Sequence, residues 1–493
     1  MEIANKNVSV VTIKIKTTPR DEAVLDNKFY VANRIYNAGV KHYKKVVDQL
    51  LSDERYKEAL KNKDYKAIKL LAREYKLSEY DLMNNMGAQA KKAYYKALPA
   101  NVVQKLASEL YKAIEKAIFK GTEIHFRKRG ATSSLSAKTK GDIVFNELEH
   151  TVKFKNRIYK LYPVRKSDIY LQHMLKYNIK YCRIVRKAHR SGYKYYLQIV
   201  LDGKSLKKLS SGSEITGLDP GISTMAYVNS AEADFVELAR SPEITKVNKE
   251  IVRLSRKLER QRRLANPQCY NEDGTIIKGS RFVNRTKGYY KTLFMLKDAW
   301  RRRSVYITQE HNKLAKKIIS SSAIIVTEKM NYAAFKRKSK NLERSDKTSK
   351  VTNKKGETKE IRKFKRRKRF GKSIQSRCPG QFIATLKHKA EAADVPIVYV
   401  NSTEFKASQY DHTTQMATKP LLSARVKEIN GNLVQRDLYS AFLLSNFKNK
   451  KSIDFAKCEE TFENFLLKQN EVVTKMKSLG DSTKNFGLKH FCI

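Results

Sequence analysis

An aspartate ends a short apolar run in the segment ITGLDPGISTMAYV, residues 215–228. The run has the composition of a buried strand, and a carboxylate buried without a partner is costly. Two explanations fit Asp219. It shapes a turn, because Asp can bond nearby backbone, Pro220 fixes φ and Gly221 accepts positive φ. Alternatively, it belongs to a group of acids whose other members lie elsewhere in the chain.

Two later acids stand in comparable positions. Glu328 ends the apolar run AIIVTE, and Asp437 begins a helical pattern in QRDLYSAFLL. For Glu328 the alternative is a strand end that emerges into solvent. For Asp437 the alternatives are a helix-start aspartate that caps free N–H groups and favours the helix dipole, or an ion pair with the adjacent Arg436.

The three acids together predict a carboxylate metal site, since they stand on two strands and at the start of a late helix. Mg²⁺ and Mn²⁺ prefer hard oxygen ligands. Two such ions can activate water and stabilise the leaving oxygen in phosphodiester hydrolysis. This pattern therefore favours a nuclease.

A large excess of basic residues indicates a polyanionic partner. The 493 residues include 102 Lys and Arg against 49 Asp and Glu, a formal charge of +53, with 27 Tyr and 20 Phe. Such an excess repels itself in a compact fold unless it is neutralised. We expect nucleic acid, held by phosphate contacts and base stacking, with a membrane surface as the alternative on charge alone. Because no run of 18 apolar residues and no signal peptide is present, we expect a soluble cytoplasmic protein without a membrane partner.

The cysteines predict neither a disulfide framework nor a cysteine-rich zinc site, because they are odd in number, scattered and without a CxxC pair. They are Cys182, Cys269, Cys378, Cys458 and Cys492.

The texture of the chain changes along its length. Residues 8–18 alternate apolar and polar side chains, as a half-buried strand does, and helical spacing follows to about residue 120. Residues 127–208 have short alternating runs typical of a small sheet or barrel, to which the first strand is a candidate to belong. Strands and helices mix from about residue 213, where a long basic helix follows the first two strands. Residues 336–369 hold 17 Lys or Arg and four acids, which indicates a solvated or disordered loop, or one that orders on a phosphate backbone.

Three segments resemble, in order, the RuvC-type motifs of the TnpB family. These are the transposon-associated RNA-guided DNA endonucleases, related to the miniature type V CRISPR effectors. The segments are GLDPG, IIVTEKMN and QRDLYSAFLL. IHFRKRG (124–130) is similar to the segment that re-enters the family's nucleic-acid-binding sheet, and RCPGQFIATLKHKAE to its helix between the second and third acids. The resemblance covers about residues 95 to 445.

The resemblance implies an α+β multidomain protein in which Asp219, Glu328 and Asp437 are the catalytic acids and hold Mg²⁺ or Mn²⁺, as two ions. An RNase H-like (RuvC) α/β nuclease domain is expected beside a small β-barrel-like wedge domain and a helical recognition domain. The expected boundaries are 1–20 for the first wedge strand, 21–125 for the recognition domain, 126–212 for the wedge or oligonucleotide-binding domain, 213–400 for the nuclease domain, and 437–493 for its end and a helical tail.

Residues 401–436 depart from the family, which usually carries a zinc ribbon of two CxxC pairs here. This segment has no cysteine, and Asp411 and His412 are too few to replace four thiolates. We therefore predict no zinc, and a segment that either folds without metal or acts as a lid over the site. Arg425 and Arg436 are candidate phosphate contacts, with ordinary surface arginines as the alternative.

The expected function is an RNA-guided DNA endonuclease. A guide RNA, from a transposon end or a CRISPR array, would pair with one strand of double-stranded DNA, while the protein reads a short flanking motif. Arg127, Lys128 and Arg129, at the start of the expected wedge domain, are candidate nucleic-acid contacts. The alternatives are an RNA-guided DNA-binding repressor that does not cut, and an unguided RuvC-like nuclease or transposase.

Overall fold

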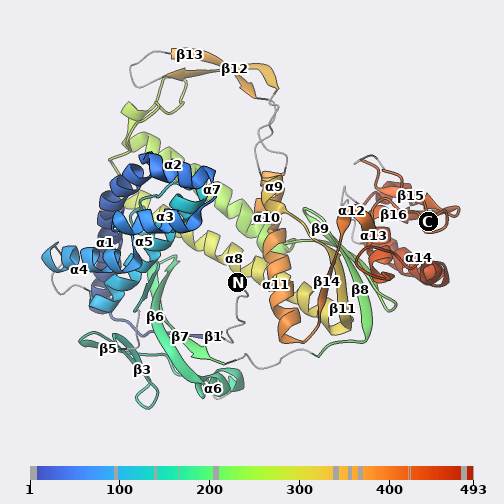
Figure 1. The fold of residues 1–493 in the computed structure, drawn as a ribbon, viewed down its shortest axis with the longest axis horizontal. Helices are drawn as coiled ribbons and strands as arrows, with labels where there is room; N and C mark the ends of the chain where they lie inside the picture. The colour runs from blue at the N-terminus through green and yellow to red at the C-terminus, as the bar shows by residue number, and fades with distance from the viewer. Residues whose placement is uncertain are drawn as a thin grey trace. The chain divides into compact units, whose positions relative to one another are not determined.

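The computed structural model describes residues 8–93, 98–137, 141–165, 167–203, 210–336, 343–352, 358–364, 370–419, 421, 423–478 and 486–491. The chain divides into two compact units, Met1–Leu206 and Lys207–Ile493. Both units mix helices with sheets, so the predicted α+β class is confirmed at that level (Figure 1).

The first unit contains two antiparallel sheets. Its strands are β1 (Val8–Lys14), β2 (Ser134–Ser136), β3 (Ile143–Asn146), β4 (Thr151–Phe154), β5 (Arg157–Lys160), β6 (Asn178–His189) and β7 (Gly192–Asp202). One sheet has the order β1-β7-β6-β2 and the other β3-β4-β5. The first strand therefore joins the later sheet as predicted, and every second residue of β1 is buried.

Six helices complete the described part of the first unit. They are α1 (Pro19–Ser52), α2 (Glu54–Lys61), α3 (Tyr65–Glu74), α4 (Glu79–Ala93), α5 (Ala100–Lys120) and α6 (Ile169–Leu175). A capping box starts α1, since the Thr18 hydroxyl accepts from the Asp21 N–H and the Asp21 carboxylate accepts from the Thr18 N–H. Gly121, at φ 61°, ends α5 in the left-handed conformation that favours glycine.

The expected β-barrel is wrong for the residues that the structure describes. In the four-stranded sheet, β1 and β2 form the two edges and do not pair with each other. The sheet stays open because helices cover its apolar side: residues of α1 and α5 share one hydrophobic core with β1, β6 and β7. The expected helical and β domains therefore form a single compact unit.

A mixed five-stranded sheet, in the order β10-β9-β8-β11-β14, lies at the centre of the second unit. Its strands are β8 (Glu214–Pro220), β9 (Thr224–Val228), β10 (Ala233–Glu237), β11 (Ser322–Glu328) and β14 (Ile397–Val400). β8 to β10 are antiparallel neighbours, whereas β11 runs parallel to both β8 and β14. Parallel neighbours need a long crossover, which the chain between β8 and β11 provides.

Helices cover both faces of this sheet (Figure 1). The helices in the described part of the second unit are α7 (Pro242–Ala265), α8 (Lys287–Ser321), α9 (Tyr332–Phe335), α10 (Gly371–Arg377), α11 (Pro379–Ala392), α12 (Ser402–Phe405), α13 (Arg436–Ser445) and α14 (Phe455–Ser478), with short 3₁₀ turns at Pro267–Cys269 and Leu488–His490. One core lies between the sheet and α8 with α11, and another between the sheet and α13 with α14.

Two hairpins complete the second unit. β12 (Arg344–Thr352) pairs with β13 (Thr358–Phe364), and β15 (Val426–Ile429) pairs with β16 (Asn432–Gln435). The first hairpin falls in the basic segment 336–369, so the loop prediction is wrong for its described residues. Backbone pairing joins the two strands, and the Thr348 hydroxyl donates to the Glu360 carboxylate at 2.7 Å.

No helix in the described ranges is long and apolar enough to cross a membrane.

Candidate active site

Asp219 lies at the end of β8 on the face that α13 covers. Side chains along a strand alternate between faces, so Gly217 and Asp219 share one face and Leu218 takes the other. Leu218 is buried in the core beneath α8 and α11. A Cβ built on Gly217 would lie 1.9 Å from the Ala441 carbonyl oxygen of α13, so this face of β8 touches the helix backbone directly.

Glu328 ends the neighbouring strand β11 on the same face. Val326 packs in the core on the α13 side and Ile325 in the core on the α8 side, so period two places Glu328 with Val326. Thr327 pairs in parallel register with Leu218, which brings the next residues, Glu328 and Asp219, to the same edge of the sheet.

Asp437 occupies the first turn of α13, but it is not the helix cap. The side-chain carbonyl of Gln435 accepts from the Leu438 N–H at 2.7 Å and performs that role. The Gln435 N–H in turn donates at 2.7 Å to Gln469 of α14, which also bonds the Leu433 carbonyl. The capping explanation for Asp437 is therefore wrong, and the helical tail has the function of fixing where α13 begins.

The charges of Glu328 and Asp437 both act on Asp219. Its side chain is half-buried and makes no hydrogen bond within the described residues, so the turn-forming explanation has no side-chain contact to support it. Burial raises the pKa of this carboxyl well above 3.8, and the charges of Asp437 and Glu328 raise it further, against a smaller opposing effect of Arg436. Burial also raises the pKa of Glu328, which the Ala407 N–H partly offsets.

Tyr332 anchors the turn that follows Asp219. Its hydroxyl donates to the Gly221 carbonyl at 3.2 Å, and burial with the nearby Asp219 charge raises the pKa of the phenol. The Pro-Gly turn is thereby held against α9.

The three acids suit a hard divalent cation by their chemistry. All are carboxylates, and the raised pKa of Asp219 marks a site with too little positive charge for its acids. As they stand, however, no three acidic, histidine or cysteine side chains in the described parts of the chain lie close enough to enclose a metal ion. Asp219 and Glu328 stand on adjacent strand ends. The third acid, Asp437, forms an ion pair with Arg436 at 3.0 Å.

The cysteine-free segment 401–436 packs against the site. The Ala407 backbone lowers the pKa of Glu328 against the effect of burial, and the Ala424 carbonyl accepts from Arg436 at 2.9 Å. Arg436 is thus not an ordinary surface arginine, whereas the Arg425 side chain has no partner among the described residues.

His412 is the buried centre of that segment. The Tyr439 hydroxyl accepts from the His412 backbone N–H at 3.0 Å and pairs with Nδ1 at 2.7 Å, and burial lowers the pKa of the imidazole. Asp411 bonds the Thr413 N–H at 2.9 Å and so shapes a turn. Packing of this kind around Tyr439 and Phe462 folds the segment in this structure, and the absence of zinc stays a prediction.

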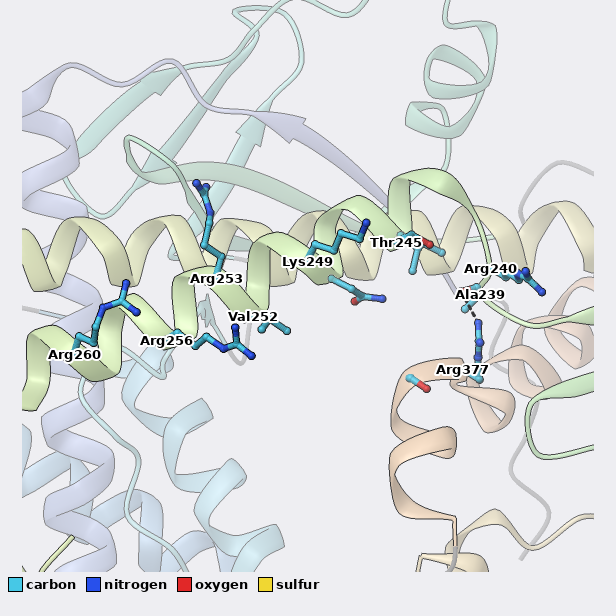
Figure 2. A pocket seen from close by; sticks show the side chains of 12 residues that line it. Ala239, Arg240, Thr245, Lys249, Val252, Arg253, Arg256, Arg260 and Arg377 are labelled. Carbon is cyan, nitrogen blue, oxygen red and sulfur yellow. Dashed lines mark hydrogen bonds between the residues drawn. The ribbon is translucent and has the colours of Figure 1, made fainter. Parts of the chain in front are cut away.

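A basic groove with a volume of about 700 Å³ follows α7 and ends at α10 (Figure 2). Six cations and no acid line it: Arg240, Lys249, Arg253, Arg256, Arg260 and Arg377. Arg240 and Arg377 both pair with Glu237, whose single charge offsets part of theirs. The other four have no ion pair within the described residues, and their spacing of four, three and four residues places them on one face of the helix.

A buried arginine supports the floor of the groove. Arg303 of α8 donates to the Asn248 side-chain oxygen and the Ser376 carbonyl, each at 2.8 Å, and both of these residues line the groove. Since these acceptors are neutral, Arg303 adds positive charge beneath a surface that already lacks acids.

The three basic candidates in the first unit differ in availability. Arg127 donates to Glu109 at 2.7 Å and stacks over Tyr36 at 3.5 Å, so it is engaged within the protein. Lys128 and Arg129 are exposed, and Arg129 lies 5.7 Å from the centre of the Tyr30 ring. The structure leaves their binding role as a prediction.

Sequence reasoning missed the α7 groove, Gly217 and the Gln435 cap. The spacing of Lys249, Arg253, Arg256 and Arg260 was a readable signal, because a stripe on one helix face can be counted from the sequence. The close approach at Gly217 had no local signal.

Asp219 should make the metal-free protein less stable as the pH rises. The pKa of Asp219 in the folded protein lies above its unfolded value of 3.8. Protonated Asp219 therefore favours the folded state at acid pH, and this contribution to the free energy of unfolding is lost as the pH rises through the folded pKa. We expect Asp219→Asn to melt at a higher temperature than the wild type at neutral pH with chelator present, and the difference to shrink toward acid pH. Glu428→Gln, at an exposed position of β15, should show no such pH dependence; equal melting curves for D219N and wild type at neutral pH would contradict the prediction.

Fold and site together define a protein of two units: a first unit of helices with antiparallel sheets, and a second, mixed α/β unit whose central sheet carries Asp219 and Glu328 beneath α13.

No protein-family model and no protein of curated function matches the chain in sequence. Among solved structures it is similar to a Cas12f1-sgRNA-target DNA complex, with a TM-score of 0.44 and 10% identity over 89% of this chain and 98% of that one. It is also similar to a CRISPR-Cas12f ternary complex (TM-score 0.24, 11% identity, 90% and 100% covered) and to the Cas12i1 R-loop complex before target DNA cleavage (0.25, 9%, 88% and 61%). These are coarse likenesses of fold, and at such scores they establish neither a family nor an activity.

Proposed function

We propose that this protein is an RNA-guided DNA endonuclease that hydrolyses phosphodiester bonds at Asp219, Glu328 and Asp437. The observation that supports it most is that Asp219 and Glu328, 109 residues apart in the chain, end adjacent strands on the sheet face covered by α13, the helix that carries Asp437. A protein that only binds nucleic acid has no need of three mutually repelling carboxylates, because they cost stability and repel phosphate. The guided mode of action rests on the resemblance of the three motifs.

The proposed roles follow from position. Asp219 and Glu328, on adjacent strand ends, form a rigid pair of ligands, and Asp437 supplies a third from α13. Mg²⁺ or Mn²⁺ bound there would neutralise the acids, activate water and stabilise the leaving oxygen. The Ala407 backbone favours the charged form of Glu328, and Tyr332 holds the turn that follows Asp219.

The α7 groove is the proposed path of a nucleic-acid backbone. Lys249, Arg253, Arg256 and Arg260, which have no ion pair within the described residues, span 11 residues of helix, about 16 Å at 1.5 Å per residue. Each side chain could contact one phosphate of a nucleic-acid backbone. Asn248 and Ser376 offer polar contacts beside them.

Neutralising two of these cations should weaken nucleic-acid binding in a salt-dependent way. For Arg253→Gln with Arg256→Gln, we expect the slope of log K against log salt to fall by about 1.4 to 1.8, because each lost phosphate contact removes about 0.7 to 0.9. Lys246→Gln with Lys257→Gln is the matched control, since both lysines are exposed on α7 and lie outside the groove. Filter binding across a salt series measures both, and equal slopes would exclude the groove.

Three measurements separate the candidate functions. The purified protein should carry a defined RNA and should cut matched DNA only with that RNA and Mg²⁺. Full activity after RNase treatment, with an absorbance ratio of pure protein, would favour an unguided nuclease or transposase. Guide-dependent binding without any cleavage would favour the repressor.

A further inference from the structure

Arg436 is tied to the carboxylate site rather than to solvent. Its Nε and Nη2 both donate to Oδ1 of Asp437, at 3.1 and 3.0 Å, and its Nη1 donates to the Ala424 carbonyl at 2.9 Å. The side chains of Arg436 and Asp437 are only 14% and 18% exposed. The backbone N–H of Arg436 is also held, by the Arg425 carbonyl at 3.0 Å. Because its guanidinium is hydrogen-bonded on both sides and largely buried, Arg436 is part of the packed structure around Asp437.

This guanidinium is the one cation that the described residues place on the three acids. No other ion pair to Asp219, Glu328 or Asp437 is present among them, and the Arg436 charge acts on Asp219 as well as on Asp437. Lys427 on β15 lies close to Arg436, but it faces the Tyr439 ring at 5.7 Å rather than the acids. Arg436 is therefore the counter-ion of the cluster in this structure.

A divalent cation and this guanidinium compete for the same carboxylate. Both are attracted to Asp437, and they repel each other in a partly buried place where screening by water is weak. The Oδ1 atom that Arg436 holds on Asp437 is an oxygen that a metal ligand would offer.

We propose that Arg436 is a resident counter-ion that must release Asp437 before a divalent metal binds, so that it weakens the affinity of the site for metal. The proposal rests on the proposed function in one respect, namely that Asp437 is a metal ligand. It assigns Arg436 a positioning role: Arg436 stabilises the metal-free acids and sets the metal concentration at which the site is filled.

The direct test is Mn²⁺ binding to the full-length protein without nucleic acid, followed by electron paramagnetic resonance and by the melting temperature. We expect Arg436→Gln to bind Mn²⁺ about tenfold more tightly than the wild type, since a charge held in a partly buried pair has been removed. Arg281→Gln, on an exposed loop of the same unit, should bind as the wild type does. Equal or weaker binding by R436Q would overturn the proposal and show that Arg436 anchors Asp437 for the metal.

A conservative variant keeps the test decisive if R436Q does not fold. Lysine retains the charge but lacks the guanidinium fork, so Arg436→Lys should release Asp437 more easily and bind Mn²⁺ about threefold more tightly than Arg281→Lys. Equal or weaker binding would again overturn the proposal.

Asp437→Asn separates this inference from the proposed function. If the wild type binds Mn²⁺ and D437N loses it while R436Q is unchanged, only the counter-ion role fails. If neither the wild type nor R436Q binds Mn²⁺, the metal site itself fails, and the proposed nuclease with it.

Discussion

Replacing Asp219 with asparagine is expected to lower Mg²⁺-dependent cleavage of guide-matched DNA on the order of 10³-fold or more, while leaving DNA binding unchanged. Asparagine has nearly the same shape but no charge, so it removes a ligand of the proposed metal ions without opening a cavity. Single-turnover cleavage of a labelled duplex measures the loss, and a gel-shift titration measures binding.

The stability of this variant makes the result informative. Because Asp219 is a half-buried carboxylate whose pKa burial raises, D219N should melt no lower than the wild type without metal, so lost activity cannot reflect unfolding. Glu428→Gln is the matched control for the loss of one carboxylate and should cut normally. Cleavage by D219N near the wild-type rate would remove this aspartate from the site.

The second large effect is expected at Gly217, where even alanine should disrupt the domain. A Cβ there would lie 1.9 Å from the Ala441 carbonyl oxygen, 2.4 Å from the Ser445 nitrogen and 2.9 Å from the Leu444 carbonyl carbon. All three are backbone atoms of α13, so no side chain can rotate away and the helix itself must move. We expect Gly217→Ala to destabilise the protein by about 3 kcal/mol or more, at the upper end for overpacking, and to reduce cleavage because α13 carries Asp437.

Gly380→Ala is the matched glycine control for thermal or urea denaturation. It lies in the first turn of α11 in the same unit, where an added Cβ would lie 3.7 Å from Tyr332 Cδ2, an ordinary van der Waals contact. Its stability should stay within about 0.5 kcal/mol of the wild type. A G217A protein as stable as G380A would show that β8 and α13 are less closely packed than the structure has them.

The strands and helices around the site were predictable because their signals are local. Alternation identified the first strand, helical spacing identified α5, and Val247, Ile251 and Leu254 are the buried face of the basic helix α7. Each depends on the period of its own side chains, so no partner need be known.

The sequence-based predictions were wrong where packing against a distant part of the chain decides the local structure. Short alternating runs are the same in an open sheet and in a barrel, and the choice here was made by α1 and α5, which cover the sheet. The described part of the basic segment 336–369 forms a hairpin, although its composition is typical of a loop. Asp437 likewise stands where caps usually stand, yet Gln435, supported by Gln469 from α14, makes the cap.

From its sequence alone, this protein has acids at the ends of two apolar strands and at the start of a late helix, together with a charge that calls for a polyanion. The tertiary structure alone decided that Asp219 and Glu328 face the same helix, that Gly217 leaves room for its backbone, and that Arg436 holds Asp437. The physical reason is separation along the chain. Alternation and helical period depend on neighbouring residues, whereas these contacts join β8, β11 and α13, which meet only when the sheet and its covering helices have assembled.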